Sequence, residues 1–124
     1  MLHIGGWFDP YLRGTMNLYQ AMVAQSKQPQ HLLIGSWGHL PWGSKLGAVD
    51  YGVAAQNPID EIQLRWFDYW LKDIDTGLLT ESSISWFEMG SNSWREFDRL
   101  PAENLPREAI FYLASDGLAG VRED

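Results

Sequence analysis

The chain opens with two short apolar runs that are separated by an amphipathic segment. The first run covers residues 2–4 and ends at Gly5-Gly6, and the second covers residues 31–36 with a continuous apolar centre. Between them, apolar residues recur every three or four positions, which predicts a helix: Leu12, Met16, Tyr19 and Val23. Continuous apolar strands that alternate with helices are typical of a parallel sheet covered on both faces, so we expect an α/β fold.

A second helix is predicted to begin at Asn57-Pro58, after a glycine-rich loop over residues 41–52. Asparagine is a favourable N-cap, and proline is tolerated at the first helical position. The helix is expected to end near residues 72–75. Its apolar side chains form one stripe: Ile59, Ile62, Trp66 and Tyr69 or Trp70.

After Gly77 the pattern changes from helical spacing to alternation. Residues 82–89 place Ile84 and Trp86 on one face, the period-two pattern of an antiparallel strand. Residues 110–113 predict another strand, closed by a turn at 115–117. We therefore expect a boundary near residues 76–82, which separates an α/β part (1–78) from a β part (79–124). Two strands do not form a stable domain alone, so the β part is expected to be incomplete.

The composition narrows the classes of partner. The net charge is −7, with 9 scattered Lys and Arg residues, which argues against nucleic acid because phosphate binding requires a basic surface. No apolar run approaches the roughly 20 residues that span a bilayer, so no membrane partner is expected. Cysteine is absent, which excludes thiol catalysis, disulfides and thiolate metal sites without fixing the compartment.

Asp9 and His39 are the candidate catalytic residues. Each follows one of the two apolar runs and a turn that contains glycine and tryptophan. Open α/β sheets place their sites at the carboxyl ends of the strands, where both residues are expected. An acid followed by a histidine is also the order of the last two members of an α/β-hydrolase triad. Asp9 could equally cap the next helix, whereas His3 and His31 are expected to be structural or exposed.

Two further interpretations concern the same region. Asp9, His39 and Asp50 could be metal ligands, but no stretch has ligand spacing such as His-Glu-x-x-His, and we predict no metal and no cofactor. Tryptophans surround the two candidate residues and could either pack in the core or line a hydrophobic substrate pocket: Trp7, Trp37 and Trp42.

Three segments together resemble one family of serine hydrolases. They read Gly-Gly-Trp-Phe-Asp at 5–9, Gly-Ser-Trp-Gly-His at 35–39 and Phe-Glu-Met-Gly-Ser-Asn-Ser-Trp-Arg at 87–95. In this order they are similar to the C-terminal half of the family of cocaine esterase, X-Pro dipeptidyl-peptidases and α-amino-acid ester hydrolases. The resemblance implies that Asp9 is the triad acid and His39 the triad base. It also implies the C-terminal part of an α/β-hydrolase sheet, followed by the first strands of a jelly-roll domain.

The serine nucleophile and oxyanion hole of that family lie upstream of the matching segments. This chain has no Gly-x-Ser-x-Gly motif. The serines that lie in or near the matching segments are therefore not expected to be the nucleophile: Ser36, Ser44, Ser91 and Ser93. The implied activity is hydrolysis of a small ester, amide or peptide substrate through an acyl-enzyme, and we expect the chain alone to be nearly inactive. The alternative is a non-catalytic binding or assembly module, which pairs with itself or with a separate N-terminal half.

Overall fold

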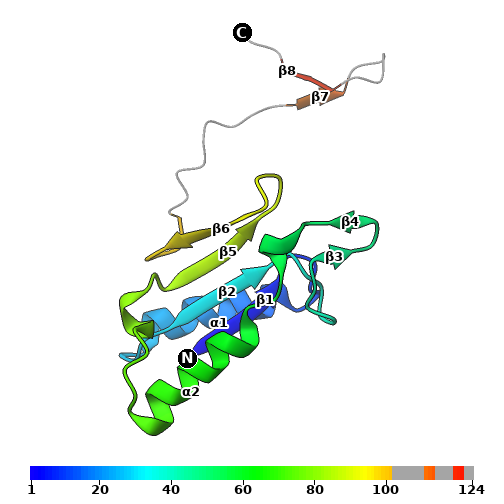
Figure 1. Ribbon diagram of the computed structural model, residues 1–124. Coiled ribbons are helices and arrows are strands. Elements are labelled where there is room, and N and C mark those ends of the chain that lie inside the picture. The colour runs from blue at the N-terminus through cyan, green and yellow to red at the C-terminus, as the bar shows by residue number, and fades with distance from the viewer. Residues whose placement is uncertain (102–110, 114–118, 122–124) are drawn as a thin grey trace.

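The computed structural model describes residues 1–101, 111–113 and 119–121 and shows a mixed α/β fold (Figure 1). In this part of the chain, the main sheet has the order β1-β2-β5-β6. Its strands are β1 (Leu2–Gly6), β2 (His31–Gly35), β5 (Ile84–Glu88) and β6 (Ser93–Phe97). The first three are parallel, and β6 is antiparallel to β5.

The helix α1 (Leu12–Gln25) connects β1 to β2 and covers one face of the sheet. Its buried Tyr19 packs with Leu32 and Ile34 of β2, and Leu12 and Met16 pack against the same cluster. Val23, the last position of the predicted stripe, is exposed. The sequence spacing therefore predicted the helix correctly but extended its buried face one turn too far.

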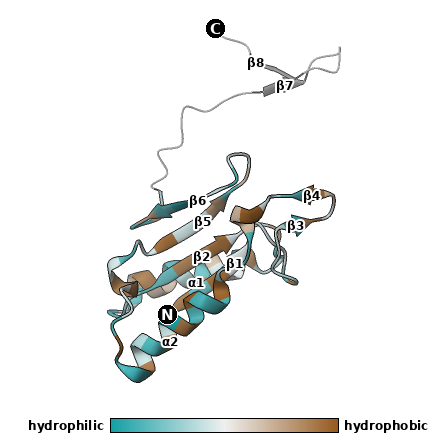
Figure 2. Ribbon diagram, viewed as in Figure 1, coloured by the Kyte–Doolittle hydropathy of each residue, from teal (hydrophilic) through white to brown (hydrophobic). Residues whose placement is uncertain are grey.

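The helix α2 (Ile59–Lys72) covers the opposite face. Leu33 of β2 packs there with Ile59 and Trp37. Because successive strand residues point to opposite faces, the consecutive apolar residues of β2 supply both cores. The hydrophobic colour along β2 in Figure 2 marks this doubly buried strand. The expectation of a sheet covered on both faces is thus confirmed.

The ends of α2 follow from local chemistry. The Asn57 Oδ1 atom accepts a hydrogen bond from the Ile59 N–H at 2.7 Å, so Asn57 satisfies a free donor of the first turn. Pro58 stands at the N-cap rather than at the first helical position, one residue from the prediction. At the other end Asp73 adopts a left-handed conformation with φ 58°, which stops the helix where the sequence pattern fades.

The second half of the sheet corrects two expectations. β5 is parallel to β2, through the pairs Leu32–Ile84 and Ile34–Trp86, and does not begin a separate antiparallel sheet. The main sheet therefore continues past the expected boundary at 76–82 as far as β6. The predicted strand itself is present, and its antiparallel partner is β6. Both Ile84 and Phe87 are buried, Ile84 in the α1 core.

Several short elements were not predicted. β6 follows β5 through a tight turn in which Gly90 has φ 103° and Asn92 has φ 51°. Positive φ angles are adopted most readily by glycine and, among the other residues, by asparagine. The loop after β2 contains the two-residue strands β3 (Lys45–Leu46) and β4 (Val49–Asp50) and the 3₁₀ turn η1 (Val53–Ala55). A second 3₁₀ turn, η2 (Leu78–Thr80), precedes β5.

The strand predicted over residues 110–113 is present as β7 (Phe111–Leu113), paired antiparallel with β8 (Ala119–Val121). The turn predicted at 115–117 lies outside the described residues, as do residues 102–110 and 122–124 of the expected jelly-roll segment. Among the residues that the structure describes, neither helix is long and apolar enough to cross a bilayer.

Candidate active site

The loops that carry Asp9 and His39 lie side by side at one edge of the sheet. β1 and β2 are neighbouring parallel strands with Gly6 opposite Gly35, so their carboxyl ends meet at the same level. The pairing continues past the strands, because the Trp7 N–H donates to the Gly35 carbonyl oxygen at 2.9 Å and the Phe8 N–H to the Trp37 carbonyl oxygen at 3.2 Å. The topology therefore brings together two residues that are 30 positions apart.

The Asp9 carboxylate contacts the His39 imidazole. The Asp9 Oδ2 and His39 Nδ1 atoms are 3.1 Å apart, and the Asp9 side chain is 10% exposed whereas that of His39 is 59% exposed. The other carboxylate oxygen, Oδ1, accepts the Tyr11 N–H at 2.8 Å. Asp9 therefore forms a turn just before α1 and contacts the histidine at the same time, but it does not cap the helix, whose N-cap is Tyr11 and which has no side-chain cap hydrogen bond.

This geometry gives the imidazole the form that a general base requires. When Nδ1–H donates to Asp9, the lone pair of Nε2 is left free to accept a proton from a nucleophile. The carboxylate also stabilises the imidazolium that forms after proton transfer. The Tyr11 ring lies edge-to-face against His39, with 5.0 Å between ring centroids. Tyr11 was missed at the sequence level, because nothing in the pattern marks a residue two positions after the acid.

The three tryptophans for which the sequence allowed either core packing or a pocket have different positions. Trp37 is 1% exposed and packs in the α2 core, which is the first of those two alternatives, and it offers no surface to a substrate. Trp7 is half-buried against the α1 core, and its indole N–H donates to the Phe87 carbonyl oxygen at 2.6 Å. Trp42 is half-buried, and its indole N–H donates to the His39 carbonyl oxygen at 2.8 Å.

The glycines of the two turns make room for Trp37. A Cβ atom on Gly35 would overlap the Trp37 ring, and one on Gly6 would overlap the Trp37 carbonyl oxygen. Only glycine therefore fits at these two positions while the indole stays in the core. In the Gly/Trp turns seen in the sequence, the glycines leave the space in which Trp37 packs at the ends of β1 and β2.

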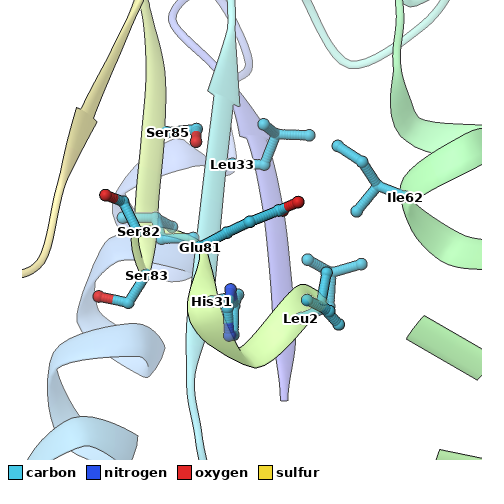
Figure 3. Close-up of a pocket in the computed structure, with 10 residues that line it drawn as sticks. Leu2, His31, Leu33, Ile62, Glu81, Ser82, Ser83 and Ser85 are labelled. Atoms are coloured by element: carbon cyan, nitrogen blue, oxygen red, sulfur yellow. The ribbon is translucent and has the colours of Figure 1, made fainter. Parts of the chain in front are cut away.

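A separate cavity of about 50 Å³ lies near the amino ends of β1 and β2 and does not include Asp9 or His39 (Figure 3). Its lining combines apolar side chains with polar ones, among them His31, Glu81 and Ser85. Burial lowers the pKa of His31, the Met1 ammonium group adds to this effect, and the Glu81 carboxylate acts against it. The His31 ring also meets Trp66 edge-on at 5.4 Å.

The lowered pKa of His31 predicts a loss of stability in mild acid. The unfolded chain binds a proton to this residue below about pH 6.5, whereas the folded chain resists binding it. Stability should therefore be full above that pH and should fall as the pH drops toward the lower, folded-state value. We expect His31→Phe to remove this component of the pH dependence in urea unfolding at pH 7.5 and 5.5. An equal pH dependence in both proteins would contradict the assignment.

The remaining candidate residues lie elsewhere. Asp50 is on the β3–β4 hairpin, where its carboxylate accepts the Gly52 N–H at 2.9 Å and lies 3.6 Å from the Lys45 Nζ atom. These contacts lower its pKa, the Gly52 N–H most. Within residues 1–101, no group of three or more acidic and histidine side chains is arranged to hold a metal ion. His3 is buried, as expected for a structural histidine, with its Nε2 3.0 Å from the Gln30 Oε1 atom.

Comparisons with known proteins agree with the sequence motifs. Residues 1–41, which include both Asp9 and His39, match the family model described as X-Pro dipeptidyl-peptidase (S15 family). Cocaine esterase from Rhodococcus sp. (strain MB1 Bresler) is 27% identical over 121 residues, which cover 94% of this chain and 20% of that protein. The chain thus spans about a fifth of the length of this relative.

A solved structure shares the fold. The crystal structure of an aminopeptidase from the marine sediment archaeon Thaumarchaeota archaeon matches with a TM-score of 0.74 and 23% identity. The match covers 98% of this chain and 20% of that one. At this level of identity the likeness concerns the fold alone.

The family model and the curated relative place the sequence similarity of this chain among hydrolases described as esterases and peptidases. The chain is similar in particular to the family of X-Pro dipeptidyl-peptidases and cocaine esterase. The resemblance inferred from the three sequence segments is therefore confirmed.

Proposed function

We propose that this chain supplies the acid and the general base of a serine hydrolase. His39 takes the proton of a serine hydroxyl and later returns it to the leaving group, and Asp9 orients the imidazole and stabilises its charged form. The substrate is an ester or amide of the acyl or X-Pro dipeptidyl type, cleaved through an acyl-enzyme. The observation that carries the proposal is the 3.1 Å contact between His39 Nδ1 and Asp9 Oδ2.

The exposure of the pair supports a catalytic role over a purely structural one. An ion pair that only stabilises the fold has no need to leave the ring of His39 mostly exposed, and exposed pairs contribute little to stability. Here the buried partner is the carboxylate and the exposed one is the base, so a nucleophile can approach the imidazole. The location at the carboxyl ends of parallel strands is also where α/β sheets bind their ligands.

The serine and the oxyanion hole belong, in this proposal, to a polypeptide segment outside these 124 residues. The 124 residues lack a Gly-x-Ser-x-Gly motif. The chain then corresponds to the C-terminal part of a hydrolase domain, followed by residues that begin a jelly-roll domain. Its own residues orient and move a proton but provide no group for His39 to activate, so the isolated chain is nearly inactive.

The first test is to read the coding DNA upstream of Met1 for an in-frame Gly-x-Ser-x-Gly motif, and to assay the chain with and without the segment that carries it. The chain alone should hydrolyse an activated aryl ester at the background rate, and the combination should turn it over. Turnover by the chain alone that is abolished by His39→Ala, or by a serine-directed phosphonate, would contradict the proposed incompleteness.

A binding or assembly module remains the second candidate, and one observation favours it. The outer side of α2 carries an exposed apolar stripe at helical spacing: Leu64, Phe67 and Leu71. Such patches commonly mark interfaces. A stable homo-oligomer of the chain in analytical ultracentrifugation, with no activity in any combination, would favour the module over the split hydrolase.

A further inference from the structure

His39 lies in a loop that has little support from the sheet. Residues 38–43 follow the last β-like contact of the strand, the bond from the Phe8 N–H to the Trp37 carbonyl oxygen. Within this loop the Gly43 N–H donates to the Pro41 carbonyl oxygen at 3.1 Å, a bond that does not reach the core. The imidazole contact with Asp9 fixes one end of the side chain and leaves the His39 backbone to be held in another way.

Trp42 provides that second attachment. Its indole Nε1–H donates to the His39 carbonyl oxygen at 2.8 Å, and its ring packs against the buried cluster of Leu33, Trp37 and Ile59. The rigid indole therefore links the peptide plane after His39 to the core beneath the sheet. Fixing that plane restricts the backbone torsion at His39 and hence the direction in which the imidazole leaves the chain.

Asp9 is positioned by a separate set of bonds. Its Oδ1 atom accepts the Tyr11 N–H, its carbonyl oxygen accepts the Leu12 N–H at 3.0 Å, and its own N–H donates to the Gly6 carbonyl oxygen at 3.0 Å. None of these bonds involves the loop of His39. The alignment of the pair consequently requires an independent support on the histidine side.

We infer that Trp42 is a positioning residue for His39, which holds the imidazole in line with Asp9 through the His39 carbonyl oxygen. The inference rests on the proposed function for its catalytic meaning, although the geometry it describes can be tested without activity. Trp42 acts through the backbone of the base and does not need to touch a substrate, a role distinct from the core packing and the pocket that the sequence allowed.

The test compares Trp42→Phe with Trp94→Phe. Both changes keep an aromatic ring against the same cluster and remove one indole donor, since the Trp94 N–H donates to the Ala54 carbonyl oxygen at 2.8 Å. Trp94 lies on β6, donates its indole N–H to Ala54 and meets the rings of Trp37 and Phe87, so it is a matched control away from the His39 backbone. Histidine-labelled protein gives the readout by NMR, with the His39 signals assigned by their loss in His39→Ala.

We expect the His39 Nδ1–H to exchange with water about three- to tenfold faster in Trp42→Phe, as the loss of one typical hydrogen bond allows. The same rate should be unchanged in Trp94→Phe. Protection of the Trp42 indole N–H in the unmodified protein is a second measurement that needs no variant. Free exchange of that N–H, or an unchanged His39 signal in Trp42→Phe, would overturn the inference.

Kinetics with the serine-bearing segment separate this inference from the proposed function. Trp42→Phe should lower kcat about tenfold and leave KM unchanged, because small misplacements of a catalytic group cost this much or more, and Trp94→Phe should change neither. If His39→Ala has no effect on turnover, the proposed function fails while the NMR result stands. If His39→Ala abolishes turnover but Trp42→Phe changes neither kcat nor the His39 signal, the positioning role fails alone.

Discussion

Replacing His39 with alanine is expected to lower kcat of the assembled hydrolase by about 10⁶-fold, since a serine nucleophile is weak without its general base. His39 is suited to this role because its Nδ1 contacts Asp9 at 3.1 Å and its side chain is 59% exposed. Burst and steady-state kinetics with an activated ester measure the change. Because the loss occurs in the chemical step, KM should change much less than kcat.

Asp9→Asn is the companion change and should cost about 10⁴-fold in kcat, because the amide stabilises the wrong imidazole tautomer. The residues act as a unit, so the double variant should be no slower than His39→Ala alone. His31→Phe is the control at pH 8, since His31 lines the cavity at the opposite end of the strands. A loss in this control as large as in His39→Ala would assign the effect to folding, and additive losses for Asp9 and His39 would contradict a common role.

Trp37→Ala should lower the free energy of unfolding by about 3–5 kcal/mol, the range for truncating a large buried aromatic side chain. Trp37 is 1% exposed, and its ring occupies the space left by the missing Cβ of Gly35 and contacts Trp94 with 6.1 Å between centroids. Alanine would leave a cavity that the surrounding strands cannot close. Urea unfolding followed by far-ultraviolet circular dichroism gives the value.

Trp70→Ala is the matched control for Trp37→Ala. Trp70 is 40% exposed on α2, so its truncation should cost clearly less. If Trp37→Ala keeps the stability of the unmodified chain and instead raises KM of the assembled enzyme, Trp37 is a pocket residue, the second of the two roles that the sequence allowed. A large stability loss with little change in KM assigns it to the core.

The sequence predicted local elements better than their partners in the sheet. The helices over residues 12–25 and 59–72 follow from apolar spacing and from the capping preference of Asn57, which act over one or two turns. β6 was missed, because its signal is a turn at Gly90 rather than a run of apolar residues. The parallel pairing of β5 was also missed, since strand alternation does not reveal which strand lies beside it.

The candidate site shows the same division. The motifs around Asp9 and His39 marked both residues as candidates and showed the family resemblance, because each residue lies in the turn that follows a strand. That the carboxylate meets the imidazole depends on the register of β1 with β2, a contact between segments far apart in the chain. The supporting groups, Tyr11 and Trp42, were visible in the sequence only as aromatic residues near the site.

The sequence by itself thus determined the α/β character and the two helices, and it singled out Asp9 and His39 as the candidate acid and base, because these predictions depend on periodicity and on residues near strand ends. Only the tertiary structure decided that Trp37 belongs to the core, that Trp42 holds the His39 backbone and that β5 extends the sheet. The physical reason is that a side chain's environment is set by the neighbours that folding brings to it, and one-dimensional spacing specifies a face of an element but not what packs against that face.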